Sequence, residues 1–329
     1  MLTRRNLLMT GGATLVAAAA AACSSSASSS TTTSASLTPI RIPDPGNEGV
    51  LAVGKKDGSL AKALAKAGGQ VQWTGSSGPF APAAEEMDAG ELDIAQGSIT
   101  SAITSLAESP KFKLFAQVEP DKLGEGVLVR KDSPITTLQG LIGKKVAVNQ
   151  GGTGEYLLLK ALANAGIDAS QVNRVYLSPA ETAPVFNSGQ VDAWATWSTY
   201  SIAQVAAGAR FVARAGEFGS QNYSVWAVRT GFAQQYPKVL TALYQYLHST
   251  TLKEIVNPSA YVNVFTTSGP EAFSAAEVAV NDTFAKAGST VNPVGATELA
   301  NFETVAQFFA TEKVTTSTVN VQPYVVDPT

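Results

Sequence analysis

Cysteine and histidine are almost absent from this sequence of 329 residues. The chain has one of each, Cys23 and His248. No disulfide can form within one chain that has a single cysteine, and a structural zinc site or a Cys/His nucleophile pair needs several such residues or a close pair. These absences argue against metal-dependent and thiol-dependent chemistry.

Charge is also sparse. Charged residues make up 15% of the chain, and 23 Lys and Arg against 26 Asp and Glu give a net charge of −3. No run of basic residues could follow a phosphate backbone, so nucleic acid is not an expected partner. The acidic pair Glu85-Glu86 is typical of a solvated helix end, and no nucleophile elbow, Walker A motif or dinucleotide fingerprint is present. The sequence predicts a protein that is not an enzyme and uses no cofactor.

The N-terminus has the pattern of an export signal. Arg4 and Arg5 precede an uncharged run from Leu7 to Ala22, which is too short and too rich in alanine to predict a membrane span. The adjacent arginines resemble the twin-arginine signal. Ala20-Ala21-Ala22-Cys23 resembles a bacterial lipobox, which implies lipidation at Cys23; an incidental cysteine beside an ordinary cleavage site is the alternative.

A Ser, Thr and Ala stretch over residues 24–38 predicts a flexible tether. With residues 1–23 as export signal, these features predict an exported protein in the periplasm or at the cell surface. The membrane would hold it through the lipid on Cys23.

From residue 39 onward, short strands alternate with helical stretches. This alternation predicts an α/β fold with mainly parallel sheets covered by helices. We expect residues 39–129 and 229–329 to form a first lobe and residues 130–228 a second. Strands near Gly126–Arg130 and Tyr223–Arg229 would join the lobes as a hinge.

Glycine and hydroxyl residues recur where predicted strands give way to helices. Ligands of open parallel sheets bind outside the carboxyl ends of strands, where glycine admits them to backbone N–H groups and each helix start contributes about half a positive charge. Any one such loop could be an ordinary turn or cap. Their coincidence predicts an anion site. The segments are Gly75-Ser76-Ser77-Gly78, Gln96-Gly97-Ser98, Gly151-Gly152-Thr153-Gly154 and Trp194–Ser198.

Two tryptophans stand three residues apart in one predicted strand. Trp194 and Trp197 should therefore point to opposite faces of the sheet. We expect Trp197, nearer the end of the strand, to line the cleft, although either ring could simply be a buried aromatic. Ser198 is the predicted cap of the helix that follows.

The order of several segments resembles the substrate-binding proteins of ABC importers, and within them the nitrate/sulfonate/taurine import family. The resemblance implies a two-lobed periplasmic-binding-protein-like (type II) fold, a monomer that closes around a small organic oxyanion and delivers it to a membrane permease driven by an ATPase. The matching segments include Gly90–Ala95, Val129–Ile135, Leu141–Val148, Tyr156–Leu162 and Val191–Trp197.

The resemblance also implies a set of ligand-binding residues. In this family, backbone N–H and hydroxyl groups of the cleft loops grip a sulfonate or a similar anion, and aromatic side chains line its organic tail. Carried onto this chain, with the first loop and the returning strand added, the set is Asn47, Ser76, Ser77, Gly78, Gly97, Ser98, Gly152, Thr153, Trp197, Ser198, Asn222 and Tyr223.

One departure from the family bears on ligands with an ammonium group. Many members have Asp-Pro-Tyr after the tryptophan, and this chain has Ser198-Thr199-Tyr200. An ammonium group would therefore need Glu125 or Glu181 as a substitute carboxylate.

Two other functions stay open. The same fold binds thiamine-precursor pyrimidines and other aromatic heterocycles, which tryptophan stacking would suit. Enzymes on this fold include a pyrimidine synthase that consumes its own histidine and a tetrapyrrole-forming deaminase with a cofactor-bearing cysteine. His248 lies far in sequence from the loops and Cys23 in the leader, so the sequence disfavours both enzymes.

Overall fold

The computed structural model describes residues 37–76, 78–108, 110–286 and 288–329. The predicted export signal, Cys23 and nearly all of the tether lie outside these residues, as does Ser77. These described residues form one compact unit. Within the described residues, no helix has both the length and the apolar character needed to cross a membrane.

The first lobe is built on five strands in two hydrogen-bonded groups. β1 and β2 pair in parallel, and β10 lies between β3 and β4 and runs antiparallel to both. The backbone N–H of Asp93 donates to the carbonyl of Arg41, which joins the two groups side by side. The strands are β1 (Thr38–Asp44), β2 (Gly69–Ser76), β3 (Ile94–Ser98), β4 (Phe112–Val118) and β10 (Ser224–Arg229).

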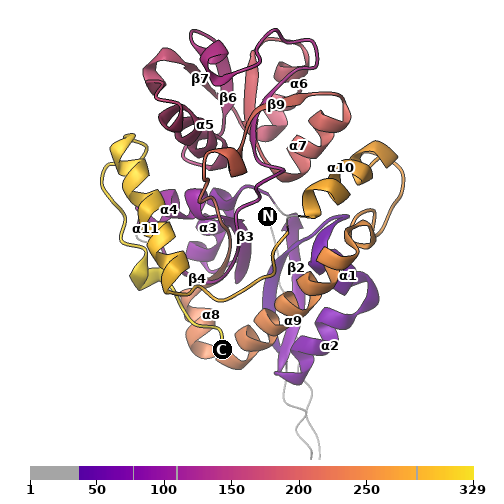
Figure 1. Cartoon of the computed structure of the whole chain (residues 1–329). Coiled ribbons are helices and arrows are strands. Elements are labelled where there is room, and N and C mark those ends of the chain that lie inside the picture. Colours follow the sequence, from indigo (N-terminus) through magenta and orange to yellow (C-terminus); the bar gives the residue numbers. More distant parts are fainter. Residues whose placement is uncertain (1–36, 77, 109, 287) are drawn as a thin grey trace, which may run out of the picture. The chain divides into compact units, whose positions relative to one another are not determined.

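Helices from both ends of the chain cover this lobe (Figure 1). The first helical stretch divides at Gly58, because Gly58 has a left-handed backbone with φ of +73°. The helices are α1 (Gly49–Asp57), α2 (Ser59–Lys66), α3 (Phe80–Ala89), α4 (Ile99–Leu106), α8 (Thr230–Gln235), α9 (Pro237–Val256), α10 (Ala275–Ala285) and α11 (Ala296–Thr311).

The second lobe has a sheet of strand order β7-β6-β8-β5-β9, at the top of Figure 1. β6 pairs in parallel with β7 and β8, while β5 runs antiparallel to β8 and β9. The elements are β5 (Gly126–Val129), β6 (Lys145–Val148), α5 (Thr153–Asn164), β7 (Asn173–Tyr176), α6 (Pro179–Asn187), β8 (Ala193–Thr196), α7 (Ser198–Ala206) and β9 (Arg210–Arg214).

The predicted α/β class is confirmed, and the strand directions add one detail. Among the described strands, one in each lobe runs against its neighbours. These strands, β10 and β5, are the ones that follow the passages of the chain between the lobes. A strand that enters a sheet from the opposite lobe arrives in the opposite direction, which the local sequence does not reveal.

The lobe boundaries also differ from the prediction. Gly126–Val129 was assigned to the first lobe and residues up to 228 to the second, yet β5 pairs within the second sheet and β10 within the first. The chain therefore crosses between lobes at residues 119–125 and 215–223. These connecting segments, rather than the strands themselves, are the candidate hinge.

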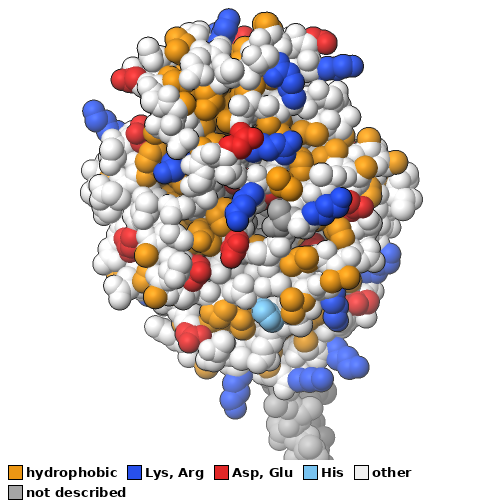
Figure 2. Space-filling model, viewed as in Figure 1, with side chains coloured by type: hydrophobic (Ala, Val, Ile, Leu, Met, Phe, Trp, Pro, Cys, Tyr) orange, Lys and Arg blue, Asp and Glu red, His pale blue; other side chains and the backbone are white. Residues whose placement is uncertain are grey.

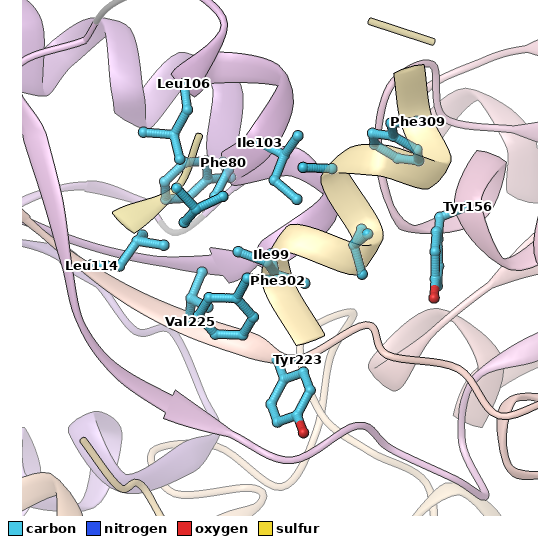
Figure 3. Packing of buried hydrophobic residues seen from close by; sticks show 14 of the residues in the cluster. Phe80, Ile99, Ile103, Leu106, Leu114, Tyr156, Tyr223, Val225, Phe302 and Phe309 are labelled. Carbon is cyan, nitrogen blue, oxygen red and sulfur yellow. The ribbon is translucent and has the colours of Figure 1, made fainter. Parts of the chain in front are cut away.

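A buried aromatic cluster lies where α11 meets both lobes. Figure 3 shows Phe302 beside Ile99 and Val225 of the first lobe. Tyr156 of α5, in the second lobe, makes edge contacts with Phe308 and Phe309, with ring centroids 5.7 and 6.0 Å apart. The C-terminal helix thus packs against both halves of the molecule.

Candidate ligand-binding site

A cleft of about 1010 Å³ lies between the two lobes. Residues that follow β1, β2 and β3 form its wall on the first lobe, and residues that follow β6, β7 and β8 form its wall on the second. Ligands of α/β sheets bind at this end of the strands, so the position agrees with the rule applied to the sequence.

Six helices begin at this cleft. Lining residues include the first turns of α1, α3, α5, α6 and α7 and the start of α4. Among the described residues, no side chain caps the N-termini of α1, α3, α5 and α7, whereas Ser98 caps α4 and Ser178 caps α6. Uncapped N–H groups and aligned peptide dipoles favour a negative group placed between them.

Hydroxyl groups supplement these backbone donors. Ser98, Ser101, Thr104 and Thr153 line the cleft. Ser98 Oγ accepts the N–H of Ser101 at 3.2 Å and lies 2.8 Å from Thr100 Oγ1. Thr104 Oγ1 donates to the carbonyl of Gly151 at 2.6 Å, a hydrogen bond that joins the two lobes at the edge of the cleft.

Aromatic side chains form part of the wall. Trp197 packs edge-on against Tyr200 with ring centroids 5.6 Å apart, and Tyr176 and Trp226 also line the cleft. The ring of Phe80 lies so close to Gly97 that a Cβ there would come within 2.5 Å of it, so Gly97 is needed for packing as well as for access. The surface suits an organic group of limited size.

Glu125 and Glu181 were predicted as candidate carboxylates of the cleft, and the structure adds two more. Glu48, Glu86, Glu125 and Glu181 line it, and no Lys, Arg or His belongs to the lining formed by the described residues. Charges of both signs are interspersed on the outer face shown in Figure 2. The cleft therefore differs from that outer face in the sign of its side-chain charge.

Glu125 is the most buried of these carboxylates, with 5% of its surface exposed. Asn222 Nδ2 donates to both of its oxygens, at 3.0 and 3.1 Å, and Thr100 Oγ1 donates to Asn222 Oδ1 at 2.9 Å. Burial raises the pKa of Glu125 well above its usual value, and the nearby charge of Asp121 adds to the effect. Burial therefore favours the protonated form of this carboxyl group.

Glu48 occupies a different environment at the N-terminus of α1. Its Oε1 accepts a hydrogen bond from Thr199 Oγ1 of the other lobe at 2.9 Å. Burial raises its pKa, and the Thr199 hydrogen bond offsets this in part. Glu181, in contrast, is exposed and closes a capping box with Ser178, which lowers its pKa.

Half of the predicted ligand-binding residues lie on the cleft wall. They are Gly78, Gly97, Ser98, Thr153, Trp197 and Ser198. Trp194 is buried against Phe186, so the two tryptophans divide between cleft and core in the predicted way. Ser76 ends β2 just after the lining residues Thr74 and Gly75.

Four predicted residues have other surroundings. Asn47 is buried and braces the loop around residues 263–273: its amide donates to Thr266 and Glu271 carbonyls, and its oxygen accepts the N–H of Phe265. Tyr223 packs in the core against Phe302, as Figure 3 shows, and its hydroxyl accepts a hydrogen bond from Asn301.

Gly152 and Asn222 lie directly behind the cleft wall. The backbone at Gly152 approaches the side chains of Asn149 and Ser101, and Asn222 holds Glu125 and Thr153. Ser198 is not the N-cap of α7; Trp197 takes that position, and Ser198 has a left-handed φ of +44°. Strained backbone of this kind often occurs at functional sites.

The sequence prediction missed several cleft residues. Tyr176, Leu177 and Ser178 lie at the carboxyl end of β7, so the rule used for the other loops could have found them. Ser101 and Thr104 lie in the first and second turns of α4, on the face toward Gly151. No sequence signal pointed to Glu48 or Trp226, because their position depends on how the two lobes meet.

This fold and cleft define a class of two-lobed binding proteins, and comparison with known proteins identifies the family. The NMT1/THI5-like family model matches residues 78–259. The chain belongs to this family.

The listed proteins that match this chain by sequence are named for the binding of aliphatic sulfonates or taurine. Residues of this chain are 30% identical to a putative aliphatic sulfonates-binding protein of Escherichia coli, over 56% of this chain and 60% of that protein. A protein of the same name from Bacillus subtilis is 31% identical over 57% and 56% of the two chains. The taurine-binding periplasmic protein of E. coli is 29% identical over 52% and 54%. The matches thus span just over half the length of these curated relatives.

Solved structures share the fold over most of the chain. The alkanesulfonate-binding protein SsuA from Xanthomonas axonopodis, solved with MOPS, has a TM-score of 0.79 at 22% identity and covers 88% of this chain and 98% of that one. The aliphatic sulphonate-binding protein SsuA of E. coli has a TM-score of 0.71 at 23% identity, over 88% and 92%. The predicted two-lobed binding-protein fold is therefore confirmed.

An enzyme shares the fold as well. The desulfurization enzyme DszB has a TM-score of 0.64 at 19% identity and covers 88% of this chain and 96% of that chain. At this identity the likeness concerns the fold alone. The relatives matched by sequence are named as binding proteins.

Proposed function

We propose that this protein is the substrate-binding component of an ABC importer and captures a small organic oxyanion of the sulfonate type between its lobes. The observation that carries the proposal is the convergence of six helix N-termini and several hydroxyl groups on one cleft between two lobes. The names of the sequence relatives support the same ligand class.

In this proposal the anionic head lies among the starts of α3, α4, α5 and α7. Backbone N–H groups near Gly78, Ser98 and Thr153 bind its oxygens, and the organic tail contacts Trp197. In its protonated form, which burial favours, Glu125 would add an O–H donor for the oxyanion. The protein binds the ligand and does not transform it.

The lobes close on the ligand by a hinge at residues 119–125 and 215–223. Hydrogen bonds that join the lobes at the cleft, such as Thr104 to Gly151 and Thr199 to Glu48, would belong to the closed state. The closed form then delivers its ligand to a membrane permease driven by an ATPase. Export, with lipidation of Cys23, would keep the protein in the periplasm or at the cell surface beside that permease.

A thermal-shift screen of the purified protein tests the ligand class. Alkanesulfonates, nitrate, bicarbonate and uncharged aromatic heterocycles are each added in large excess. A ligand at about 100 times its dissociation constant adds roughly 2.7 kcal/mol of stability, which raises the melting temperature by about 2 °C or more. A shift with sulfonates supports the proposal, and a shift with uncharged heterocycles alone overturns the oxyanion assignment in favour of the heterocycle alternative.

A further inference from the structure

The wall of the cleft on the first lobe extends beyond Ser98 along one face of strands β3 and β10. Residues that lie opposite each other in antiparallel strands share a face of the sheet, as do alternate residues of one strand. The strip on this face comprises Ser98 with its opposite Ser224, Gln96 with its opposite Trp226, and Ile94, and all five line the cleft. Two residues of a strand span about 7 Å, so a short organic chain held at the start of α4 can reach from Ser98 to Gln96 and Trp226.

Three polar side chains of this strip have no hydrogen-bond partner among the described residues. Trp226 is 3% exposed, and its indole N–H is an unpaired donor. The side-chain amide of Gln96 and the hydroxyl of Ser224 also make no hydrogen bond with a described residue. A buried donor without a partner is costly, so a ligand that supplies an acceptor at this point gains affinity.

The chemistry of these side chains specifies the acceptor. An indole N–H can only donate, and a carbonyl oxygen has two lone pairs, so one carbonyl can accept from Trp226 together with Gln96 or Ser224. A second anionic group does not suit this wall, because Glu48 also lines the cleft and no Lys, Arg or His belongs to the lining formed by the described residues. A neutral carbonyl group avoids that repulsion. The carbon atoms beside it would contact the apolar lining residues Ile42, Val50, Leu51 and Ile94.

The size of the cleft leaves room for such a group. Its volume of about 1010 Å³ lies at the upper end of the range for pockets that bury drug-sized ligands, about 300 to 1,000 Å³. A sulfonate with a tail of only two carbon atoms would fill a small part of this space.

We propose that Trp226, Gln96 and Ser224 form a second polar subsite of the cleft, which binds a carbonyl oxygen in the tail of the ligand. This inference rests on the proposed function and specifies its ligand as an organosulfonate that carries a ketone or an amide a few carbon atoms from the sulfonate. The helix N-termini bind the charged head, and the subsite selects the tail. An alkyl tail of the same size leaves the Trp226 N–H unpaired, so the subsite discriminates against it.

Isothermal titration with two ligands of the same size and charge tests the inference on the unmodified protein. 4-Oxopentane-1-sulfonate and 4-methylpentane-1-sulfonate differ only in a carbonyl oxygen against a methyl group. We expect the ketone to bind at least about fivefold more tightly, because one neutral hydrogen bond is worth about that factor. Equal affinities, or tighter binding of the methyl compound, would overturn the inference and leave the proposed function intact. Binding of neither compound, nor of straight-chain alkanesulfonates, would overturn the proposed function itself.

Two variants assign the preference to a residue. Trp226→Phe removes the donor and should bring the two affinities to within about twofold of each other, mainly through weaker binding of the ketone. Trp73→Phe is the matched control, because Trp73 packs against the same core cluster and does not belong to the described lining of the cleft. It should keep the preference for the ketone. A folded Trp226→Phe protein with an unchanged preference would refute the role of Trp226.

The indole N–H itself reports the contact in the unmodified protein. The chain has four tryptophans, and labelling them with nitrogen-15 gives each indole N–H its own resonance. The ketone should move the Trp226 resonance downfield, as a new hydrogen bond does, and the methyl compound should not. Equal shifts with both compounds would contradict a hydrogen bond to the carbonyl.

Discussion

The two ends of strand β3 lie in opposite surroundings. At its start, away from the cleft, Asp93 is 1% exposed and accepts hydrogen bonds from the guanidinium groups of Arg41 and Arg229 at 2.7 to 2.9 Å. At its end, Ser98 opens into the cleft, where no Lys or Arg lines the described wall. The sheet therefore has one end with paired charges and one end whose donors and acceptors stay available.

The pKa values of two buried carboxylates, Asp93 and Glu125, show this difference. Burial alone would raise the pKa of both Asp93 and Glu125. Hydrogen bonds from Arg41 and Arg229 reverse this for Asp93 and lower its pKa, whereas the neutral amide of Asn222 leaves the pKa of Glu125 raised well above its usual value. The first carboxylate joins β1, β3 and β10, and the second lies beside the cleft, where burial favours its protonated form.

Substitution of Asp93, at the end of β3 where the charges are paired, should change the free energy of unfolding more than any of the other substitutions below. Asp93→Asn removes the charge that faces two arginines, and breaking a buried pair in this way costs about 3 kcal/mol. Urea denaturation should show that loss in the free energy of unfolding. Ligand affinity should stay the same in the folded variant. The exposed Glu85→Gln is the control, and a loss below about 1 kcal/mol for Asp93→Asn would contradict the role assigned to the pairs.

On the cleft wall, Trp197→Ala should change the ligand affinity more than the free energy of unfolding. Loss of the indole face should weaken ligand binding at least about tenfold, equivalent to about 1.4 kcal/mol, which calorimetric titration measures. Trp197→Phe keeps an aromatic surface and should recover part of the affinity. Unchanged affinity in the alanine variant would remove Trp197 from the site.

Trp226→Phe should lower ligand affinity without a large loss of stability, in contrast to Asp93→Asn. The substitution removes a buried donor that has no partner among the described residues, so the free energy of unfolding should change by less than about 1 kcal/mol or increase. Affinity for a sulfonate with a carbonyl group in its tail should fall by about three- to tenfold, because the ligand loses a donor. A large loss of stability with unchanged affinity would show that Trp226 acts only in packing.

The pH dependence of stability should have opposite signs for the two carboxylates. Asp93 has a lowered folded-state pKa, so its contribution is present above the unfolded-state value of about 3.9 and is lost as the pH falls through the folded-state value. Glu125 has a raised pKa, so the folded protein loses stability as the pH rises above about 4.3, where the unfolded state ionises first.

Glu125→Gln tests the pH dependence predicted for Glu125. Near pH 4 its effect on the free energy of unfolding should be the smallest of these variants. Glutamine can still accept a hydrogen bond from Asn222 and cannot ionise, so the variant should match the parent at low pH and become relatively more stable as the pH rises. Chemical denaturation at pH 4, 5.5 and 7 measures the difference. A variant that loses stability toward pH 7 would indicate that Glu125 is ionised in the folded protein.

Local sequence patterns predicted most elements of the fold. The sequence predicted short strands that alternate with helical stretches, and the structure has this alternation, for example in β6 (Lys145–Val148), α5 and β7 (Asn173–Tyr176). These predictions rested on runs of apolar residues between glycines and polar turns, which act within one element. The insertion of β10 between β3 and β4 joins residues more than a hundred positions apart, so no local pattern could give it.

The residues of the candidate site also divide into those that a local pattern could predict and those that it could not. Gly97, Ser98 and Thr153 were found because each lies in a segment where a strand gives way to a helix. Asn47 and Tyr223 were misplaced because adjacency in sequence does not show which way a buried side chain points: Asn47 turns toward residues 263–273 and Tyr223 toward α11. The outcome depends on segments from the other end of the chain.

The sequence by itself determined the α/β class, the alternation of elements and the glycine and hydroxyl residues at strand ends, because these follow from the spacing of apolar and turn-forming residues. Only the tertiary structure decided which of those ends share a cleft. It placed Glu48 and Trp226 on the cleft wall. It also placed the arginines of the first sheet, Arg41 and Arg229, beside Asp93 at the end of β3 away from the cleft. The charge of a site is a sum over residues distant in sequence, and that sum exists only once the two lobes have packed together.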